Sequence, residues 1–217
     1  MADRDSRAGT RYYDPAILEY VEKVHAAHDG GLDSAFTSPD RDHIPAIQVG
    51  KSEGRLLELL VRMVGARRAV EVGTLAGYSA IRIARGLGED GRLWTIEVMP
   101  EHAEVARRNL ATAGLTEQVE VVIGDAMAVL PALETHGPFD AVFIDADKER
   151  YDQYGRWAAR NLRPGGLLVG DNAFLFGNLL HDTPAGQAMR RFHEEAAVAF
   201  DSVCVPTPDG LLVGLKR

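Results

Sequence analysis

Short apolar runs alternate with helix-like segments through most of the chain. Five runs bounded by turn residues predict strands at 69–73, 93–97, 119–125, 140–147 and 167–172. Helical periodicity predicts helices between them, at 79–87, 100–113, 126–133 and 148–162. Continuous apolar strands that alternate with helices are typical of a parallel sheet with right-handed crossovers. The pattern therefore predicts an α/β fold with helices on both faces of the sheet.

The residues before the first strand follow a different pattern. Residues 1–14 are polar and are predicted to form an arm, while Asp14-Pro15 supplies a capping side chain and a proline at a helix start. Apolar residues then follow at helical spacing: Ile17, Leu18, Val21 and Val24. Residues 29–46 carry repeated glycine and proline breakers, which predicts a loop, and a second helix is expected at about 52–64.

The C-terminal residues predict a hairpin after a last helix at 184–198. The runs DSVCV (201–205) and LLVGL (211–215) flank PTPDG, with Asp209-Gly210 in the turn. The sheet is therefore expected to be mostly parallel and to end in an antiparallel hairpin.

Composition and charge narrow the functional class. A net charge of −8 weighs against a nucleic-acid partner, which usually needs a basic face. The single cysteine, Cys204, excludes an internal disulfide and favours a cytoplasmic location. No apolar run approaches the roughly 20 residues that span a bilayer, and residues 1–14 lack the apolar core of a signal peptide, so no membrane association is expected. The functional classes that remain are an enzyme and a small-molecule binder.

Each of the five predicted strands ends in a carboxylate, namely Glu71, Glu97, Asp125, Asp145 and Asp171. Asp125 by itself is explained equally well as a helix cap. Because the carboxyl ends of parallel strands gather at one edge of the sheet, the five together predict a ligand crevice there.

The first strand leads into a glycine loop, Gly73–Gly77, that lets a ligand approach the backbone. The loop lacks G-x-G-x-x-G, the fingerprint that a nicotinamide-dependent oxidoreductase would need. Glu71, just before the loop, suits a cationic group such as an amino acid ammonium, and Glu97 is placed to accept hydrogen bonds from ribose hydroxyls. A ribose-bearing ligand without phosphate, such as S-adenosylmethionine (SAM), fits both acids.

Asp145, Asp171 and Asn172 follow two neighbouring strands and offer three oxygen ligands. Such a set suits Mg²⁺, Mn²⁺ or Ca²⁺ rather than zinc, and two facing carboxylates repel unless a cation lies between them. The alternative is that Asp171-Asn172 only forms a turn. Lys148 opens the next helix, where a positive charge is poorly placed against the helix dipole, so a functional role is plausible beside the alternative of a solvated lysine.

At these residues the chain resembles the caffeoyl-CoA and catechol class of cation-dependent O-methyltransferases. The likeness covers about residues 45–217, through IQVGKSEG (47–54), EVGTLAGYS (71–79), TIEV (95–98), GDA (124–126), FDAVFIDADKERY (139–151), LRPGGLLVGDN (162–172) and the closing PDGLLVGLKR. The resemblance implies a class I SAM-dependent methyltransferase fold, Rossmann-like, with a seven-stranded sheet. It also implies a homodimer.

The resemblance also implies roles for individual residues. It implies SAM contacts from Val49, Glu71, Gly73, Thr74, Ser79, Glu97, Ala126, Asp145 and Asp147. It implies metal binding by Asp145, Asp171 and Asn172, and catalysis by Lys148 as general base beside Asp145. Where plant relatives carry a tryptophan-asparagine pair before Gly177, this chain has Leu175-Phe176, which argues against caffeoyl-CoA as the acceptor and for a free phenolic or a natural product.

Phe174 and Phe176 alternate around Leu175, so both are predicted to line an apolar acceptor pocket, with core packing as the alternative. The chain is thus expected to be one methyltransferase domain, 1–217. Residues 1–46 form its arm, first helix and substrate-side loop, and 47–217 form its SAM- and metal-binding core. The expected reaction is metal-dependent methyl transfer to a small catechol or vicinal diol. A SAM-binding protein without metal-dependent catalysis is the main alternative, and a methyltransferase for RNA or protein would be expected to show a basic surface.

Overall fold

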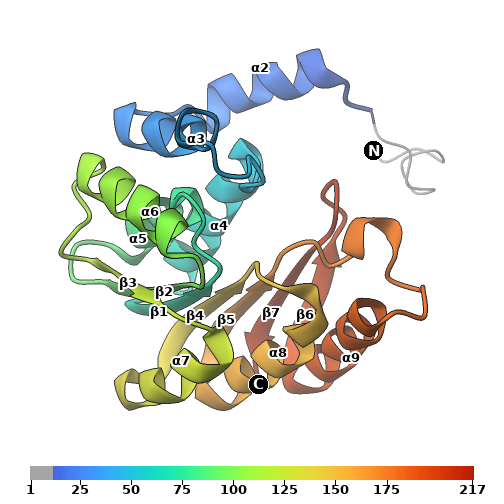
Figure 1. The fold of residues 1–217 in the computed structure, drawn as a ribbon. Coiled ribbons are helices and arrows are strands. Elements are labelled where there is room, and N and C mark those ends of the chain that lie inside the picture. The colour runs from blue at the N-terminus through green and yellow to red at the C-terminus, as the bar shows by residue number, and fades with distance from the viewer. Residues whose placement is uncertain (1–11) are drawn as a thin grey trace.

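The computed structural model describes residues 12–217, so most of the arm predicted at 1–14 lies outside the described residues. Within them, seven strands form one sheet in the order β3-β2-β1-β4-β5-β7-β6 (Figure 1). The strands are β1 (Arg68–Val72), β2 (Arg92–Glu97), β3 (Val119–Ile123), β4 (Phe139–Ile144), β5 (Leu162–Gly170), β6 (Phe200–Val205) and β7 (Leu211–Lys216). Neighbours among β1 to β5 are parallel, whereas β7 is antiparallel to both β5 and β6. The predicted sheet and its C-terminal hairpin are confirmed.

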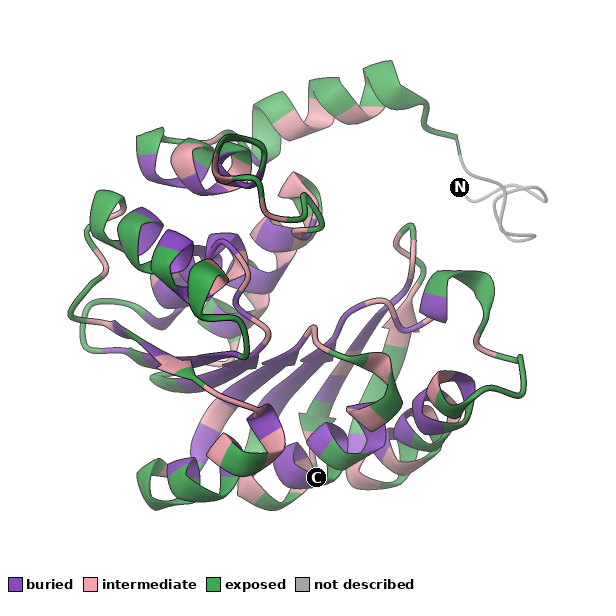
Figure 2. Cartoon of the chain, viewed as in Figure 1, coloured by how far each residue is buried: buried purple, intermediate pink, exposed green. Residues whose placement is uncertain are grey.

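The central strands are buried on both faces because successive side chains point to opposite sides of the sheet. In β1, Ala69 packs into one core and Val70 into the other, and in β4 Phe143 and Val142 divide in the same way. Figure 2 shows this buried centre as continuous purple along the middle strands. This explains why the strands form continuous apolar runs in the sequence.

Helices cover both faces of the sheet (Figure 1). One face carries α4 (Lys51–Met63), α5 (Tyr78–Leu87) and α6 (Pro100–Thr112), with α3 (Gly30–Asp42) packed outside them. The other carries α7 (Ala126–Leu133), α8 (Tyr151–Asn161) and α9 (Pro184–Ala199). The short 3-10 helices are η1 (Glu134–His136), η2 (Lys148–Arg150) and η3 (Leu175–Gly177). The first described helix, α2 (Pro15–His25), contacts α4 and buries none of its residues.

The loop predicted at 29–46 is wrong for most of its length, because residues 30–42 form α3. Its first turn is capped by Asp29, whose carboxylate accepts hydrogen bonds from the N–H groups of Gly31 and Leu32. Leu32 and Ala35, which lie on the inner face of this helix, are buried. Burial of this kind stabilises a helix whose sequence alone is unfavourable.

Pro39 lies inside α3 without ending it. A proline there leaves the carbonyl of Ala35 without its usual N–H partner. The hydroxyl of Ser38 donates to that carbonyl at 3.0 Å and replaces the missing bond. The residue that looked like a breaker is thereby compensated by the residue before it.

Candidate active site

A cavity of about 640 Å³ opens at the carboxyl edge of the parallel strands. It lies at the switch point of the sheet, where the chain proceeds from β1 toward β2 on one side and from β4 toward β5 on the other. Eleven of the residues predicted for the site line it: Val49, Gly73, Thr74, Ser79, Glu97, Ala126, Asp145, Asp147, Lys148, Asn172 and Phe176. The structure therefore brings together most of the predicted set.

The glycine loop after β1 passes very close to the end of β4. Gly73 has a φ of +99°, and a Cβ at this position would collide with the carbonyl oxygen of Asp145. Gly77, with a φ of +82°, precedes the first residue of α5. Only glycine permits this approach at Gly73, which keeps the two strand ends side by side at the cavity.

Glu97, at the end of β2, binds the backbone of this loop. Its Oε2 accepts the N–H of Leu75 at 2.8 Å and that of Thr74 at 3.3 Å, and its Oε1 accepts the N–H of Met99 at 3.0 Å. The carboxylate is buried, with 6% of the residue exposed, yet it lines the cavity. A carboxylate offers about four acceptor sites, so capacity remains for a ligand hydroxyl.

Glu71 lies behind the cavity wall rather than in it. It is fully buried and does not belong to the cavity lining among the described residues. Thr95 donates to its Oε2 at 2.5 Å, and the Thr95 hydroxyl in turn contacts that of Thr74 at 2.5 Å. Burial raises the pKa of Glu71 to about 8, against hydrogen bonds from Ser79 and Thr95 that lower it. Glu71 is thus linked to the cavity wall through the hydroxyl groups of Thr95 and Thr74.

The carboxylates of Asp145 and Asp171 follow directly on the neighbouring strands β4 and β5. The N–H of Asp171 donates to the carbonyl of Ile144 at 3.0 Å, which places the two acids in register. Burial, and next the charge of Asp145, raise the pKa of Asp171 to about 7. Asn172 follows in a left-handed conformation with a φ of +51° and lines the cavity, whereas Asp171 lies below the lining.

No group of three or more His, Cys, Asp or Glu side chains is arranged to hold a metal ion within residues 12–217. The predicted metal ligands differ from such a group, because they are two carboxylates, Asp145 and Asp171, and one amide, Asn172. All three offer hard oxygen donors of the kind that Mg²⁺ or Ca²⁺ prefers.

Lys148 is the first residue of η2 and points to the same edge. Its Nζ donates to Asp145 Oδ1 at 3.0 Å and to the hydroxyl of Tyr151 at 3.0 Å. The Tyr151 hydroxyl lies 2.8 Å from the carbonyl oxygen of Asp171, and burial raises the pKa of this tyrosine well above its usual value. Lys148 is thereby held against the carboxylate of Asp145 and, through Tyr151, is linked to the backbone of Asp171.

Sequence reasoning missed a second ionic cluster on the cavity wall, centred on Arg150. Its Nη1 donates to Asp125 Oδ2 at 2.7 Å and its Nε to Asp147 Oδ2 at 2.8 Å, while the hydroxyl of Tyr154 donates to Asp147 Oδ1 at 2.5 Å. Arg150 also holds the pKa of the Asp125 carboxyl below its usual range. The spacing of Asp147 and Arg150, three residues apart, was the available signal.

The structure separates the two phenylalanines predicted for the acceptor pocket. Phe176 lines the cavity and is 67% exposed, and Ile47, 71% exposed, lies on the same lining. Phe174 is half-buried and is absent from the lining formed by the described residues. Its ring packs against Gly210 in the hairpin turn.

A mostly parallel sheet with β7 inserted antiparallel between β5 and β6, and a cavity at its switch point, defines the class I methyltransferase fold. The chain belongs to the O-methyltransferase family, which matches residues 33–216. This membership confirms the enzyme class that the motifs indicated.

Individual relatives cover most of the chain. A catechol O-methyltransferase of Niastella koreensis is 44% identical over 183 residues, which cover 82% of this chain and 83% of that protein. An O-methyltransferase structure from Bacillus cereus in complex with SAH has a TM-score of 0.88 at 36% identity, covering 93% of this chain and 97% of that chain. The O-methyltransferase TomG from Streptomyces achromogenes, involved in tomaymycin synthesis and solved in complex with SAM, has a TM-score of 0.86 at 36% identity, covering 93% and 96%. Among the described helices of the present protein, none has the length and apolar character needed to cross a membrane.

Proposed function

We propose that the protein transfers a methyl group from SAM to one hydroxyl of a small catechol or other vicinal diol, with a divalent cation at the acceptor. The observation that carries this proposal is the pairing of Asp145 with Asp171 beside Lys148. Glu97 ends β2 and Asp171 follows β5, and β1 and β4 lie between them in the sheet. The cofactor and the acceptor would therefore occupy different ends of one cavity.

The cofactor end of the cavity is the glycine loop with Glu97. The loop lets a ligand approach the backbone at Gly73, and Glu97 faces the cavity as an acceptor for ribose hydroxyls. Ser79 and Thr74 lie on the same lining, and the Thr74 hydroxyl contacts that of Thr95, which donates to buried Glu71. These hydroxyl groups can bind the amino acid part of SAM. The complexes of the two similar structures with SAH and with SAM support this assignment.

The acceptor end fits a divalent cation by its donor chemistry. Asp145, Asp171 and Asn172 would hold Mg²⁺, or alternatively Mn²⁺ or Ca²⁺, and the ion would bring the two oxygens of a vicinal diol together at this end of the cavity. When bound, such an ion lowers the pKa of a coordinated hydroxyl. The buried carboxylate of Asp171 beside Asp145 supports the fit, because its repulsion would be relieved by a cation.

The residues around the acceptor complete the proposed mechanism. Lys148, in its neutral form, takes the proton of the attacking hydroxyl, and Asp145 holds its Nζ in place. The hydroxyl oxygen forms a bond to the methyl carbon as the carbon–sulfur bond breaks, which leaves a neutral thioether on the cofactor. The exposed side chains of Phe176 and Ile47 supply an apolar wall for the acceptor ring.

We further propose a homodimer in the cytoplasm. Helix α2 presents Ile17, Tyr20 and Val24 on one face, and each is about half exposed or more. A second copy of the chain is the proposed occupant of this face. Sedimentation equilibrium should show a dimer, and changing Tyr20 and Val24 to lysine should produce monomers. The single free Cys204 supports a reducing compartment.

The test is a methyl-transfer screen read by mass spectrometry. Catechols, caffeate-like acids and flavonoids are each incubated with SAM, with Mg²⁺ or with EDTA, and a monophenol serves as the matched control. We expect methyl transfer to the diols only when Mg²⁺ is present, and little transfer to the monophenol in either condition. Equal rates in EDTA, or equal rates on the monophenol, would refute the role of the metal.

A further inference from the structure

The segment between β5 and α9 carries unusual backbone strain. Asn172, Leu175 and Phe176 have φ values of +51°, +52° and +52°, and none of them is glycine. A left-handed conformation is unfavourable for an ordinary residue and less so for asparagine. Two of the three, Asn172 and Phe176, line the acceptor end of the cavity. Their positions therefore depend on contacts that hold the segment in a conformation it would not adopt alone.

Those contacts come from the turn of the C-terminal hairpin. The N–H of Ala173 donates to the carbonyl of Gly210 at 2.9 Å, and the N–H of Phe174 donates to the carbonyl of Asp209 at 2.9 Å. The N–H of Phe176 donates to Asp209 Oδ1 at 2.8 Å, across 33 residues of sequence. The last bond is the only one of the three that a side-chain substitution removes.

The turn fits the segment closely. Gly210 has a φ of +77°, its N–H reaches the carbonyl of Thr207 at 3.3 Å, and a Cβ on it would lie 2.8 Å from the ring of Phe174. The half-buried Phe174 thus rests on the turn while its neighbour Phe176 faces the cavity. The hairpin turn and the acceptor segment form one unit.

Asp209 is more than a turn-forming residue. Its Oδ2 is buried and has no hydrogen-bond partner within residues 12–217, although Oδ1 holds Phe176. A buried carboxylate oxygen without a partner is costly, and a turn with proline at its second position does not require an aspartate at this place. The bond to the strained Phe176 is the contact that accounts for this side chain.

We propose that Asp209 is a positioning residue for the acceptor site, and that its Oδ1 sets the location of the Phe176 ring. The role of Asp209 in acceptor binding rests on the proposed diol methylation. Its role in holding the backbone of Phe176 does not depend on that function. Asp209 itself does not belong to the cavity lining formed by the described residues.

The first test measures the contact without catalysis. Amide hydrogen exchange is followed by NMR in the parent, Asp209→Ala, Asp209→Asn and the control Asp201→Ala. Asp201 is an exposed aspartate of the same hairpin that pairs with Arg217 at 2.8 Å. In Asp209→Ala the Phe176 amide should exchange about tenfold faster, the equivalent of one hydrogen bond. Asp209→Asn keeps an acceptor oxygen and should exchange like the parent, as should Asp201→Ala.

The second test measures the acceptor site. With an unsymmetrical catechol, Asp209→Ala should raise the acceptor KM about tenfold and change the ratio of the two monomethylated products, with SAM affinity unchanged. Asp209→Asn should restore the parent values. If Asp209→Ala does not fold by circular dichroism, Asp209→Ser, which has too short a side chain to reach Phe176, replaces it in both tests.

The outcomes separate the two proposals. An unchanged Phe176 exchange rate in Asp209→Ala overturns the positioning role whether or not the parent methylates a diol. Faster exchange with the parent KM and product ratio overturns the link to the acceptor site. A parent without diol methylation, together with faster Phe176 exchange, overturns the proposed function and leaves the backbone role of Asp209 supported.

Discussion

The carboxylate of Glu97 holds the backbone of Leu75, with 2.8 Å between Oε2 and the Leu75 nitrogen. Leu75 has a left-handed φ of +48°, which an ordinary residue adopts only under constraint. Glu97 therefore shapes the glycine loop in addition to facing the cavity. Any measurement on this residue reports both roles.

Replacing Glu97 by alanine should weaken SAM binding by about 1–3 kcal/mol, because it removes a buried acceptor and leaves backbone donors unpaired. Isothermal titration with SAM measures the change. Glu101→Ala, an exposed glutamate in the first turn of α6, is the matched control and should bind like the parent. Unchanged affinity in Glu97→Ala would contradict the cofactor assignment.

Lys148→Met should reduce kcat about 10²- to 10⁴-fold, the usual contribution of a general base, while SAM affinity stays within about twofold. The control is Lys216→Met, since Lys216 lies at the end of antiparallel β7, on the opposite edge of the sheet from the cavity. Single-turnover rates separate the chemical step from product release. A Lys148→Met enzyme with the parent kcat would exclude lysine as the base.

Asp171→Asn should abolish methyl transfer while SAM still binds, and EDTA should do the same to the parent until Mg²⁺ or Mn²⁺ is restored. Without metal at pH 8, the same variant should be more stable than the parent by about 1–3 kcal/mol, because it removes a buried carboxylate that faces Asp145. Thermal unfolding in EDTA measures this. Asp90→Asn, at an exposed turn, should change neither property. Full activity of Asp171→Asn would contradict the metal site.

Phe176→Ala should change acceptor preference and leave the free energy of unfolding within about 0.5 kcal/mol, because the ring is mostly exposed. Phe174→Ala should instead cost about 2 kcal/mol, because its ring packs on Gly210. Competition between two catechols and chemical denaturation give the two readouts. A large loss of stability in Phe176→Ala, with the parent's preferences kept, would favour core packing for this residue.

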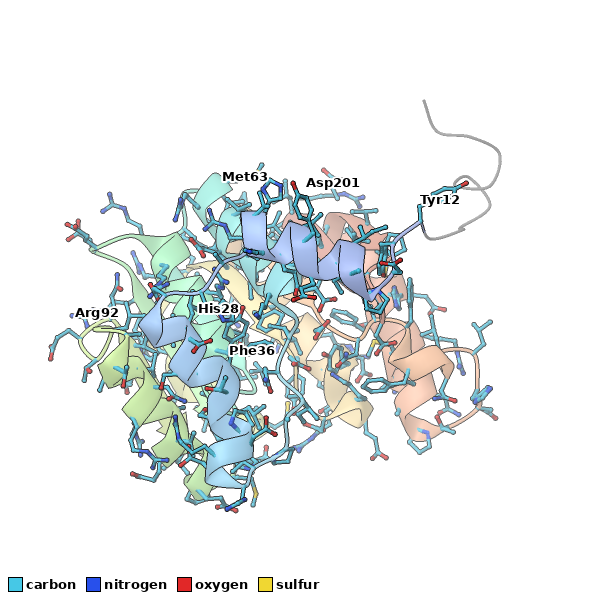
Figure 3. The ribbon with its side chains drawn as sticks, turned by 90° about the horizontal axis from the view of Figure 1, so that it is seen from above. Tyr12, His28, Phe36, Met63, Arg92 and Asp201 are labelled. Atoms are coloured by element: carbon cyan, nitrogen blue, oxygen red, sulfur yellow. The ribbon has the colours of Figure 1, made fainter. Side chains whose placement is uncertain are left out.

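We expect the protein to be less stable in mild acid than at neutral pH, because His28 is held in its neutral form in the folded chain. Its Nε2 lies 2.9 Å from the Tyr78 hydroxyl, and its ring contacts that of Phe36 (Figure 3). Burial, then the charges of Lys51 and Arg82, lower the pKa of His28 from 6.5 to about 4, against opposing contributions from Asp33 and Asp29.

Between pH 6.5 and about 4 the unfolded chain binds a proton at His28 that the folded chain does not, so stability falls as the pH falls. The full pKa difference corresponds to about 3 kcal/mol, and solvent screening reduces the expected loss of stability to about 2 kcal/mol, which denaturation curves across this range should show. His28→Gln should remove this part of the pH dependence, and His25→Gln, exposed on α2, should retain it. Identical pH profiles for the parent and His28→Gln would contradict the assignment.

The sequence by itself determined the sheet, its hairpin and the edge at which the chemistry gathers. Apolar periodicity and turn residues act over a few neighbours, so β4, β5 and the Asp209-Gly210 turn were predictable from them. The acids after those strands, Asp145 and Asp171, meet because the carboxyl ends of parallel strands always share one edge. No detail of the loops was needed for that conclusion.

Only the tertiary structure decided how deep each side chain lies and which way it points. Burial of Leu32 and Ala35 makes a helix where breakers predicted a loop, and the packing of β1 against its neighbours puts Glu71 behind the wall. The expectation that Phe174 and Phe176 share a side assumed an extended backbone, in which alternate residues point the same way. The left-handed residues 175 and 176 break that alternation, and the contact that holds Phe176 comes from 33 residues away. Sequence patterns report neighbours along the chain, whereas these positions depend on contacts that exist only after folding.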